Sequence, residues 1–183
     1  MRKLMFVVFC LILGAGSALA QTTDLMISEY VEGSGNNKAL EIYNGTEDVI
    51  NLGGYSIERY SNGATVAVSI GLNAVDLQPG SAFVITNSLA DANLLALADQ
   101  TDIDINFNGD DTIVLAFGGS LVIDSFGVVG EDPGSYWSCP DGNTANHTMR
   151  RLSGVCNGDT DTSDVFNPCD EWNFAPIDVI SGL

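Results

Sequence analysis

Short runs of apolar or alternating apolar and polar residues, separated by turn residues, dominate the chain from residue 24 onward. Each run is six to eight residues long and rich in β-branched and aromatic side chains, which is typical of β-strands. The predicted strands are Leu25–Glu32, Lys38–Asn44, Tyr55–Tyr60, Ala64–Ile70, Ala82–Asn87, Thr112–Phe117 and Leu121–Gly127, with another through Thr148–Arg150. Strands at a spacing of roughly ten residues predict an all-β protein, either an antiparallel sandwich or a barrel.

The segments between these runs carry residues that tolerate a positive φ angle. Examples are Gly33–Asn37, Ser61–Gly63 and Asn108-Gly109. Gly118-Gly119 lies between two predicted strands and predicts a hairpin with a two-residue turn.

One segment departs from the strand pattern. Residues Ser88–Asp99 are rich in Leu and Ala and predict a short helix across one end of the sandwich, with Asn87 or Ser88 as its N-cap. After Pro133 the chain is loop-rich, and we expect Trp137 and Trp172 to anchor it to the core.

The first twenty residues have the pattern of a signal peptide. Arg2 and Lys3 precede a ten-residue apolar run, and Ala18-Leu19-Ala20 predicts cleavage between Ala20 and Gln21. Ten apolar residues are too few to span about 30 Å of hydrocarbon. We therefore expect a single domain over residues 21–183 that is secreted or periplasmic and not inserted in a membrane after cleavage.

The predicted mature chain is strongly acidic. The whole sequence has 24 acidic and 6 basic residues, and two of the bases lie in the leader, so residues 21–183 carry a net charge of −20. Such a surface repels nucleic acids and anionic lipids, which argues against either as a direct partner. We expect the remaining bases, Lys38, Arg59, Arg150 and Arg151, to pair with acids on neighbouring strands such as Glu29, Glu41 and Glu58.

Three cysteines remain after cleavage, at positions 139, 156 and 169. A disulfide between Cys139 and Cys156 is predicted to staple the loop-rich C-terminal segment, because both flank the strand through Met149. The competing interpretation is a zinc site that uses these cysteines and His147, although no C-x-x-C pair is present.

Catalysis finds little support in the sequence. His147 is the single histidine, and no nucleophile elbow, P-loop or H-E-x-x-H motif occurs. The acid pairs Asp110-Asp111, Glu131-Asp132 and Asp170-Glu171 are sequence neighbours, whose side chains point to opposite faces of a strand. We predict that the protein is not an enzyme and has no assigned catalytic residues.

Calcium is the one cofactor that the sequence brings into question. Asp104, Asn106, Asn108 and Gly109 match the start of an EF-hand loop, but Leu115 stands where the motif requires an acid. A second group, Asp159, Asp161 and Asp164, crowds oxygen ligands into the C-terminal loop. These three are candidate Ca²⁺ ligands, and the simpler alternative is that they only solvate the loop. No other cofactor is expected.

Several segments together resemble the bacterial, secreted branch of the lamin tail domain family. They are ISEYVEGSGNNKALEIYNGT, LGGYSIERYSNG, FVITNS, INFNGDDTIVL and DSFGVVGEDPGSYW, in the family's order, and the resemblance extends from about Leu25 to Trp172. It implies an immunoglobulin-like β-sandwich that is generally non-catalytic. In bacteria such domains often accompany exported nucleases or phosphatases.

Resemblance and residues together lead to three hypotheses. The first is a secreted, non-catalytic module that binds a protein or a surface glycan outside the cell, with an unidentified partner. The second is an accessory or remnant domain of an exported nuclease or phosphatase system. The third is a structural domain stabilised by Ca²⁺.

Overall fold

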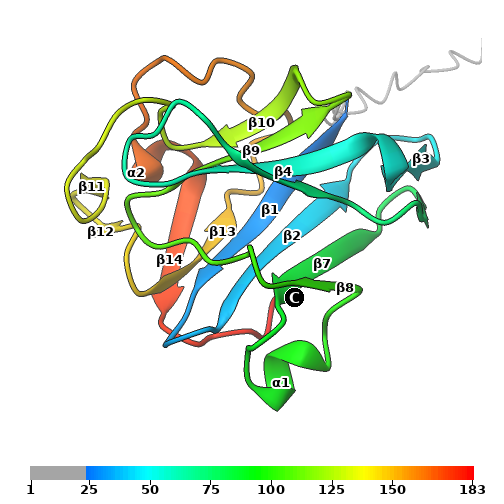
Figure 1. Cartoon of the computed structure of the whole chain (residues 1–183), viewed down its shortest axis with the longest axis horizontal. Coiled ribbons are helices and arrows are strands. Elements are labelled where there is room, and N and C mark those ends of the chain that lie inside the picture. The colour runs from blue at the N-terminus through cyan, green and yellow to red at the C-terminus, as the bar shows by residue number, and fades with distance from the viewer. Residues whose placement is uncertain (1–23) are drawn as a thin grey trace, which may run out of the picture.

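Two packed β-sheets form the core of the molecule in the computed structural model, which describes residues 24–183 (Figure 1). The predicted signal peptide and its cleavage site between Ala20 and Gln21 lie outside the described residues. Within residues 24–183, no helix has the length and apolar character needed to cross a membrane.

The larger sheet has six strands and is antiparallel except at one edge, where β7 and β8 run parallel. Across the sheet the order is β14 (Trp172–Pro176), β13 (His147–Arg151), β1 (Leu25–Glu32), β2 (Lys38–Asn44), β7 (Ala82–Asn87) and β8 (Gln100–Asp102). The central position of β1 between β2 and β13 joins the two ends of the described chain in one sheet (Figure 1).

The second sheet has four antiparallel strands in the order β10 (Leu121–Phe126), β9 (Thr112–Phe117), β4 (Tyr55–Tyr60) and β5 (Val68–Gly71). Minor elements complete the fold, namely two strand pairs and three short helices. They are β3 (Ile50–Asn51) with β6 (Asp76–Leu77), β11 (Ser138–Cys139) with β12 (Gly142–Asn143), the 3₁₀ turn η1 (Leu52–Gly54), α1 (Ala92–Leu95) and α2 (Pro168–Glu171).

Apolar side chains from both sheets fill the space between them, which explains the alternating sequence pattern. The fully buried Tyr30 stacks on Phe107 and Phe126, with ring centroids 4.7 and 4.2 Å away. Trp137 and Trp172 are buried, as anchors of the loop-rich segment were expected to be. Trp172 packs edge-on against Phe126, and Trp137 packs against Phe166, which in turn contacts Phe126. The predicted all-β, immunoglobulin-like sandwich is therefore confirmed.

Local details depart from the sequence-based expectations. The β9–β10 hairpin pairs Phe117 with Leu121, so its loop has three residues and not two. The helix is confined to Ala92–Leu95 and its N-cap is Asp91, whose carboxylate accepts from the backbone of Asn93 and Leu94. The flanking residues are held by hydrogen bonds to β7 and β8, which prevent the helix from extending over Ser88–Asp99.

The edge strand β5 is shorter than predicted and is partly covered by a side chain. Gln100 of β8 donates its amide to the Gly71 carbonyl and accepts from the Asn73 backbone amide, at 2.9 and 2.8 Å. The amide thereby satisfies backbone groups that an open edge would expose to another chain.

The predicted disulfide between Cys139 and Cys156 is wrong. Cys139 pairs with Cys169, with Cα atoms 5.9 Å apart, and Cys156 is a free thiol. After β13 the chain turns and returns through α2, so Cys169 comes back beside β11 while Cys156 stays in the intervening loop. A disulfide nevertheless closes the loop-rich segment, and it suggests an oxidising compartment.

Every lysine and arginine within residues 24–183 takes part in an ion pair. The pairs are Lys38–Glu32, Arg59–Asp111, Arg150–Glu29, and Arg151 with both Asp124 and Glu171. Of the predicted acid partners only Glu29 is used in this way, whereas Glu58 accepts from the hydroxyls of Ser56 and Ser69. Most of these pairs are buried, so they are part of the fold and leave the surface acidic.

Candidate functional site

A polar pocket of about 410 Å³ opens where three loops meet at one end of the sandwich. The first loop joins β1 to β2, the second, residues 61–67, joins β4 to β5, and the third, residues 103–111, leads into β9. The floor of the pocket is formed by buried residues and its rim by exposed asparagine side chains. The lining residues are Gly35, Lys38, Arg59, Ser61, Asn62, Asn106, Phe107, Asn108 and Asp111.

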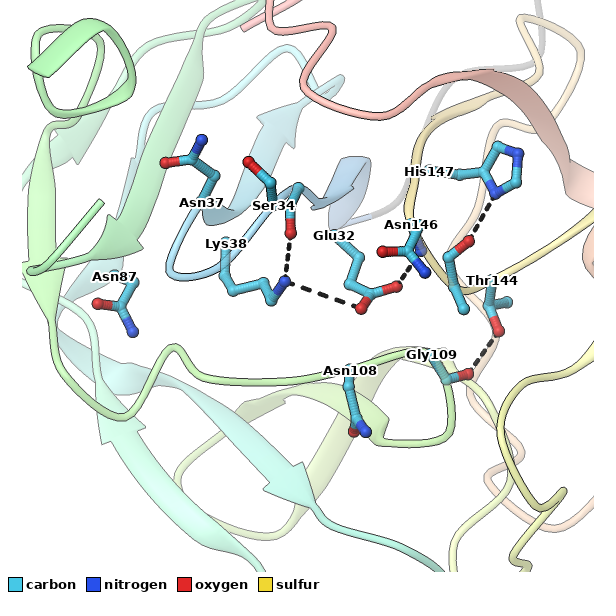
Figure 2. Close-up of polar contacts among 12 residues, drawn as sticks. Glu32, Ser34, Asn37, Lys38, Asn87, Asn108, Gly109, Thr144, Asn146 and His147 are labelled. Carbon is cyan, nitrogen blue, oxygen red and sulfur yellow. Dashed lines mark hydrogen bonds and ion pairs between the residues drawn. The ribbon is translucent and has the colours of Figure 1, made fainter. Parts of the chain in front are cut away.

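Three buried polar side chains fix the 103–111 loop. Asn87 donates its amide to the carbonyls of Ile103 and Ile105, and the Tyr30 hydroxyl donates to the Asn108 carbonyl at 3.2 Å. At the far end of the loop, the Thr144 hydroxyl donates to the Gly109 carbonyl (Figure 2). Because the loop is held from three separate strands and loops, its backbone is fixed before any ligand arrives.

The β1–β2 loop is fixed as firmly from the opposite side. The Asp178 carboxylate accepts from the Ser34 backbone and from the Asn37 amide, and Asn37 also exchanges hydrogen bonds with Asp91. Gly33 is required here, because a Cβ atom at this position would lie 2.7 Å from the Asn37 backbone carbonyl oxygen and 2.4 Å from the Asp178 carboxylate. Both walls of the pocket are therefore pre-formed.

A buried ion pair lies beneath the pocket. Glu32 stands between the Lys38 ammonium, 3.7 Å away, and the Asn146 backbone amide, which donates to it (Figure 2). Lys38 also donates to the Gly33 carbonyl. Burial raises the pKa of Glu32 and lowers the pKa of Lys38, since both charges are removed from water. The pair ties β1, β2 and the approach to β13 together.

The second wall of the pocket presents another ion pair. The Arg59 guanidinium lies 3.6 Å from the Asp111 carboxylate and also donates to the Asp104 carbonyl. Burial raises the pKa of Asp111, although the Asn62 backbone amide and Arg59 act in the opposite direction. Asp110, next in the chain, is buried, and its Oδ1 has no hydrogen-bond partner among residues 24–183.

His147 lies near this region but has none of the surroundings of a catalytic base. Its Nδ1 is 2.7 Å from the Ala145 carbonyl oxygen (Figure 2), and its ring packs edge-on against Phe174. Within the described part of the chain, no serine, threonine or cysteine side chain hydrogen-bonds to it. The contacts of His147 therefore position a loop and supply no activated nucleophile.

The candidate calcium ligands are in the C-terminal loop, away from the pocket. Asp159 accepts from the Asp161 backbone and the Ser125 hydroxyl, and Asp161 accepts from the backbone and hydroxyl of Ser163. Asp159 and Asp164 line a separate cavity of about 280 Å³ with Asp170 and Glu171. Across residues 24–183, no group of three or more His, Cys, Asp or Glu side chains is arranged to hold a metal ion.

The polar pocket was not predicted from the sequence, although several of its residues had attracted attention. Asn106 and Asn108 appeared in the imperfect EF-hand match, and Lys38 and Arg59 were expected only to pair with acids. The usable signal was the succession of asparagines beside turn glycines, which recurs in all three loops of the pocket. What the sequence could not reveal is that the sheet order brings those loops together.

Comparison with known proteins places this architecture in a family. The family model described as Lamin Tail Domain matches residues 18–130, which is more than half of the chain. The matched region contains all three loops of the pocket and the strands β1 to β10 that position them. A search of the curated proteins found no match.

Proposed function

Because the chain belongs to the lamin tail domain family, we propose that it is a non-catalytic binding module that acts outside the cell and takes its ligand in the polar pocket. The observation that carries this proposal is the pre-formed pocket. The side-chain amides at its rim, on Asn62, Asn106 and Asn108, make no hydrogen bond within residues 24–183. Buried side chains that hold a loop rigid reduce the entropy lost when a ligand binds it.

The absence of catalysis is part of this proposal. The family is one of non-catalytic immunoglobulin-like domains, and the pocket contains no residue pair of the kind that activates a nucleophile. The two cationic side chains of the pocket, Lys38 and Arg59, are each paired with a carboxylate. Paired cations are better suited to hydrogen bonding with a ligand than to stabilising a negative charge that develops during a reaction.

The export of the protein and the chemistry of its partner are supported by different observations. The disulfide and the signal-peptide pattern of residues 1–20 favour action outside the cytoplasm. Nucleic acid is disfavoured as a partner because every lysine and arginine within residues 24–183 is already paired with an acid. A protein or a glycan remains as the ligand class, and an accessory role beside an exported nuclease or phosphatase is the alternative.

Binding to intact cells tests this proposal. The labelled chain is added to the producing cells, and retained fluorescence is compared for the wild type and the double variant Asn106→Ala/Asn108→Ala. Asn173→Ala is the control, because Asn173 is exposed on β14 and does not line the pocket. We expect saturable binding that the double variant loses and the control keeps. Binding that is absent, or equal in all three proteins, would contradict the proposal.

A further inference from the structure

The polar pocket combines hydrogen-bond donors and acceptors in a way that selects among ligand classes. Each rim side-chain amide, on Asn62, Asn106 and Asn108, offers two donors and one acceptor, and the Ser61 hydroxyl, which accepts from Arg59, offers a donor. Arg59 and Asp111 place a donor and an acceptor side by side on the wall, 3.6 Å apart. Neighbouring hydroxyl groups, which both donate and accept, match such a surface.

The charges around the pocket oppose a charged ligand. Lys38 and Arg59 line it together with Asp111, and two further buried acids lie nearby, Glu32 paired with Lys38 and Asp110 next to Asp111 in the chain. Because both cations already pair with a carboxylate, an anion would find no free cation and would lie close to the Asp111 carboxylate. A cation would find the Asp111 carboxylate already paired with Arg59 and would lie close to that guanidinium. A neutral ligand avoids both penalties.

The pocket also lacks an apolar platform. Phe107 is its one aromatic residue, and this side chain is only 1% exposed because it stacks on Tyr30. An apolar ligand would therefore find little surface to bury, while the volume of about 410 Å³ lies within the range of small-molecule sites. Recognition has to come from hydrogen bonds at the rim and wall.

We propose that this pocket binds a neutral saccharide, with its hydroxyl groups held by the three rim asparagines and by the Arg59–Asp111 pair. The inference rests on the proposed function, because it assigns a ligand class to the same site. Without a stacking surface the binding is weak and depends on several hydrogen bonds at once. Loss of two rim amides should therefore reduce it strongly.

Calorimetry and saturation-transfer NMR on the purified chain test the ligand class. The neutral probes are maltotriose, cellotriose and tri-N-acetylchitotriose, the anionic probe is trigalacturonic acid, and the cationic probe is chitosan trimer. We expect at least one neutral trisaccharide to bind more tightly than both charged probes. The double variant Asn106→Ala/Asn108→Ala should weaken that binding at least tenfold, and Asn173→Ala should leave it unchanged.

Two variants separate a role in recognition from a structural one. Arg59→Lys keeps the charge that faces Asp111 but removes the planar fork, including the Nε–H that donates to the Asp104 carbonyl. It should weaken saccharide binding and lower the melting temperature modestly, so its binding is measured at a temperature at which circular dichroism shows it folded. Circular dichroism melts of the asparagine variant check that its fold is intact. A variant that has lost binding only because it has unfolded would show a lowered melting temperature.

Failure of the saccharide inference can be distinguished from failure of the binding function. If cell binding requires Asn106 and Asn108 but no neutral saccharide binds, or a charged probe binds more tightly, the ligand class is wrong and the binding site stands. If cell binding is absent or independent of these residues, the proposed function itself fails. A neutral saccharide that binds the double variant as tightly as the wild type would overturn the assignment of the pocket.

Discussion

Removal of the Cys139–Cys169 disulfide is predicted to cost about a quarter to three quarters of the stability of a typical domain. The bond closes a loop with a sequence separation of 30 residues. For a loop of this length, chain entropy in the unfolded state gives a stabilisation of about 3.6 kcal/mol at 25 °C. Domains are typically stable by about 5–15 kcal/mol. For a domain of this size the loss corresponds to a decrease of roughly 7–14 °C in the melting temperature.

The variant Cys139→Ser/Cys169→Ser measures this loss, and Cys156→Ser is its matched control. Urea unfolding followed by tryptophan fluorescence reports on the affected segment directly, since Trp137 lies two residues before Cys139 and Trp172 three residues after Cys169. We expect the double variant to unfold at lower urea and the control to match the wild type. Reduction of the wild type with dithiothreitol should reproduce the double variant.

Peptide mapping tests the pairing itself. Cleavage at aspartates separates Cys156 from Cys169, because Asp159, Asp161 and Asp164 lie between them. The wild type should show a cross-linked fragment that contains Cys139 and Cys169, together with one free thiol. A cross-link between Cys139 and Cys156, or a double variant as stable as the control, would refute the pairing and the entropy argument.

Three further predictions concern buried polar groups and calcium. Burial raises the pKa values of five acids above those of the unfolded chain, namely Glu29, Glu32, Asp111, Asp124 and Glu171. Because these acids bind protons more readily in the folded state, the free energy of unfolding should fall as pH rises from about 4 through their folded pKa values. A melting temperature that increases steadily from pH 4 to 7 would contradict this. Thr144→Val should lower the free energy of unfolding in urea by about 1–3 kcal/mol, because it leaves the Gly109 carbonyl and the Trp137 backbone amide without their partner. The control Thr148→Val should cost little, since the buried Thr148 hydroxyl has no partner within residues 24–183. Equal losses would remove the basis for a fixed 103–111 loop. If Ca²⁺ stabilises the loop that contains Asp159, Asp161 and Asp164, a chelator should lower the melting temperature and millimolar CaCl₂ should restore it, and an unchanged midpoint would eliminate the structural-calcium alternative.

The strands were predictable because their signal is local. Alternation of apolar and polar residues reports which side of a strand faces the core, and the turn residues mark where each strand ends. The short elements β3, β6, β8, β11 and β12 have no such pattern, because two or three residues cannot alternate recognisably. They exist because neighbouring segments of the folded chain hold them in place.

The ion pairs show where sequence reasoning could have gone further. Glu32 and Lys38 are cross-strand partners in the β1–β2 hairpin, so the register of a predictable hairpin brings them together. Glu29 was among the acids expected to pair with a base, but its partner Arg150, 121 positions away, was not assigned. Arg151 instead contacts Asp124 and Glu171, a choice that depends on how the two sheets pack and has no local signature.

The disulfide and the pocket both depend on long-range topology. Cys156 and Cys169 are equally plausible partners for Cys139 until the return of the chain through α2 is known. The asparagines of the pocket rim likewise lie in separate loops that meet only because β1, β4 and β9 converge at one end of the sandwich. Residue types were visible in the sequence, but their proximity was not.

The place of β1 in the larger sheet also governs when the protein can finish folding. The first strand of the described chain, β1, pairs with β13. In turn, β13 pairs with β14, which forms one edge of the sheet. In a chain that emerges N-terminus first from a ribosome or a membrane pore, β1 therefore cannot complete its pairing until β13, which ends at Arg151, has also emerged. Such long-range pairing slows folding, and during that delay the cysteines stay accessible to oxidation and to mispairing.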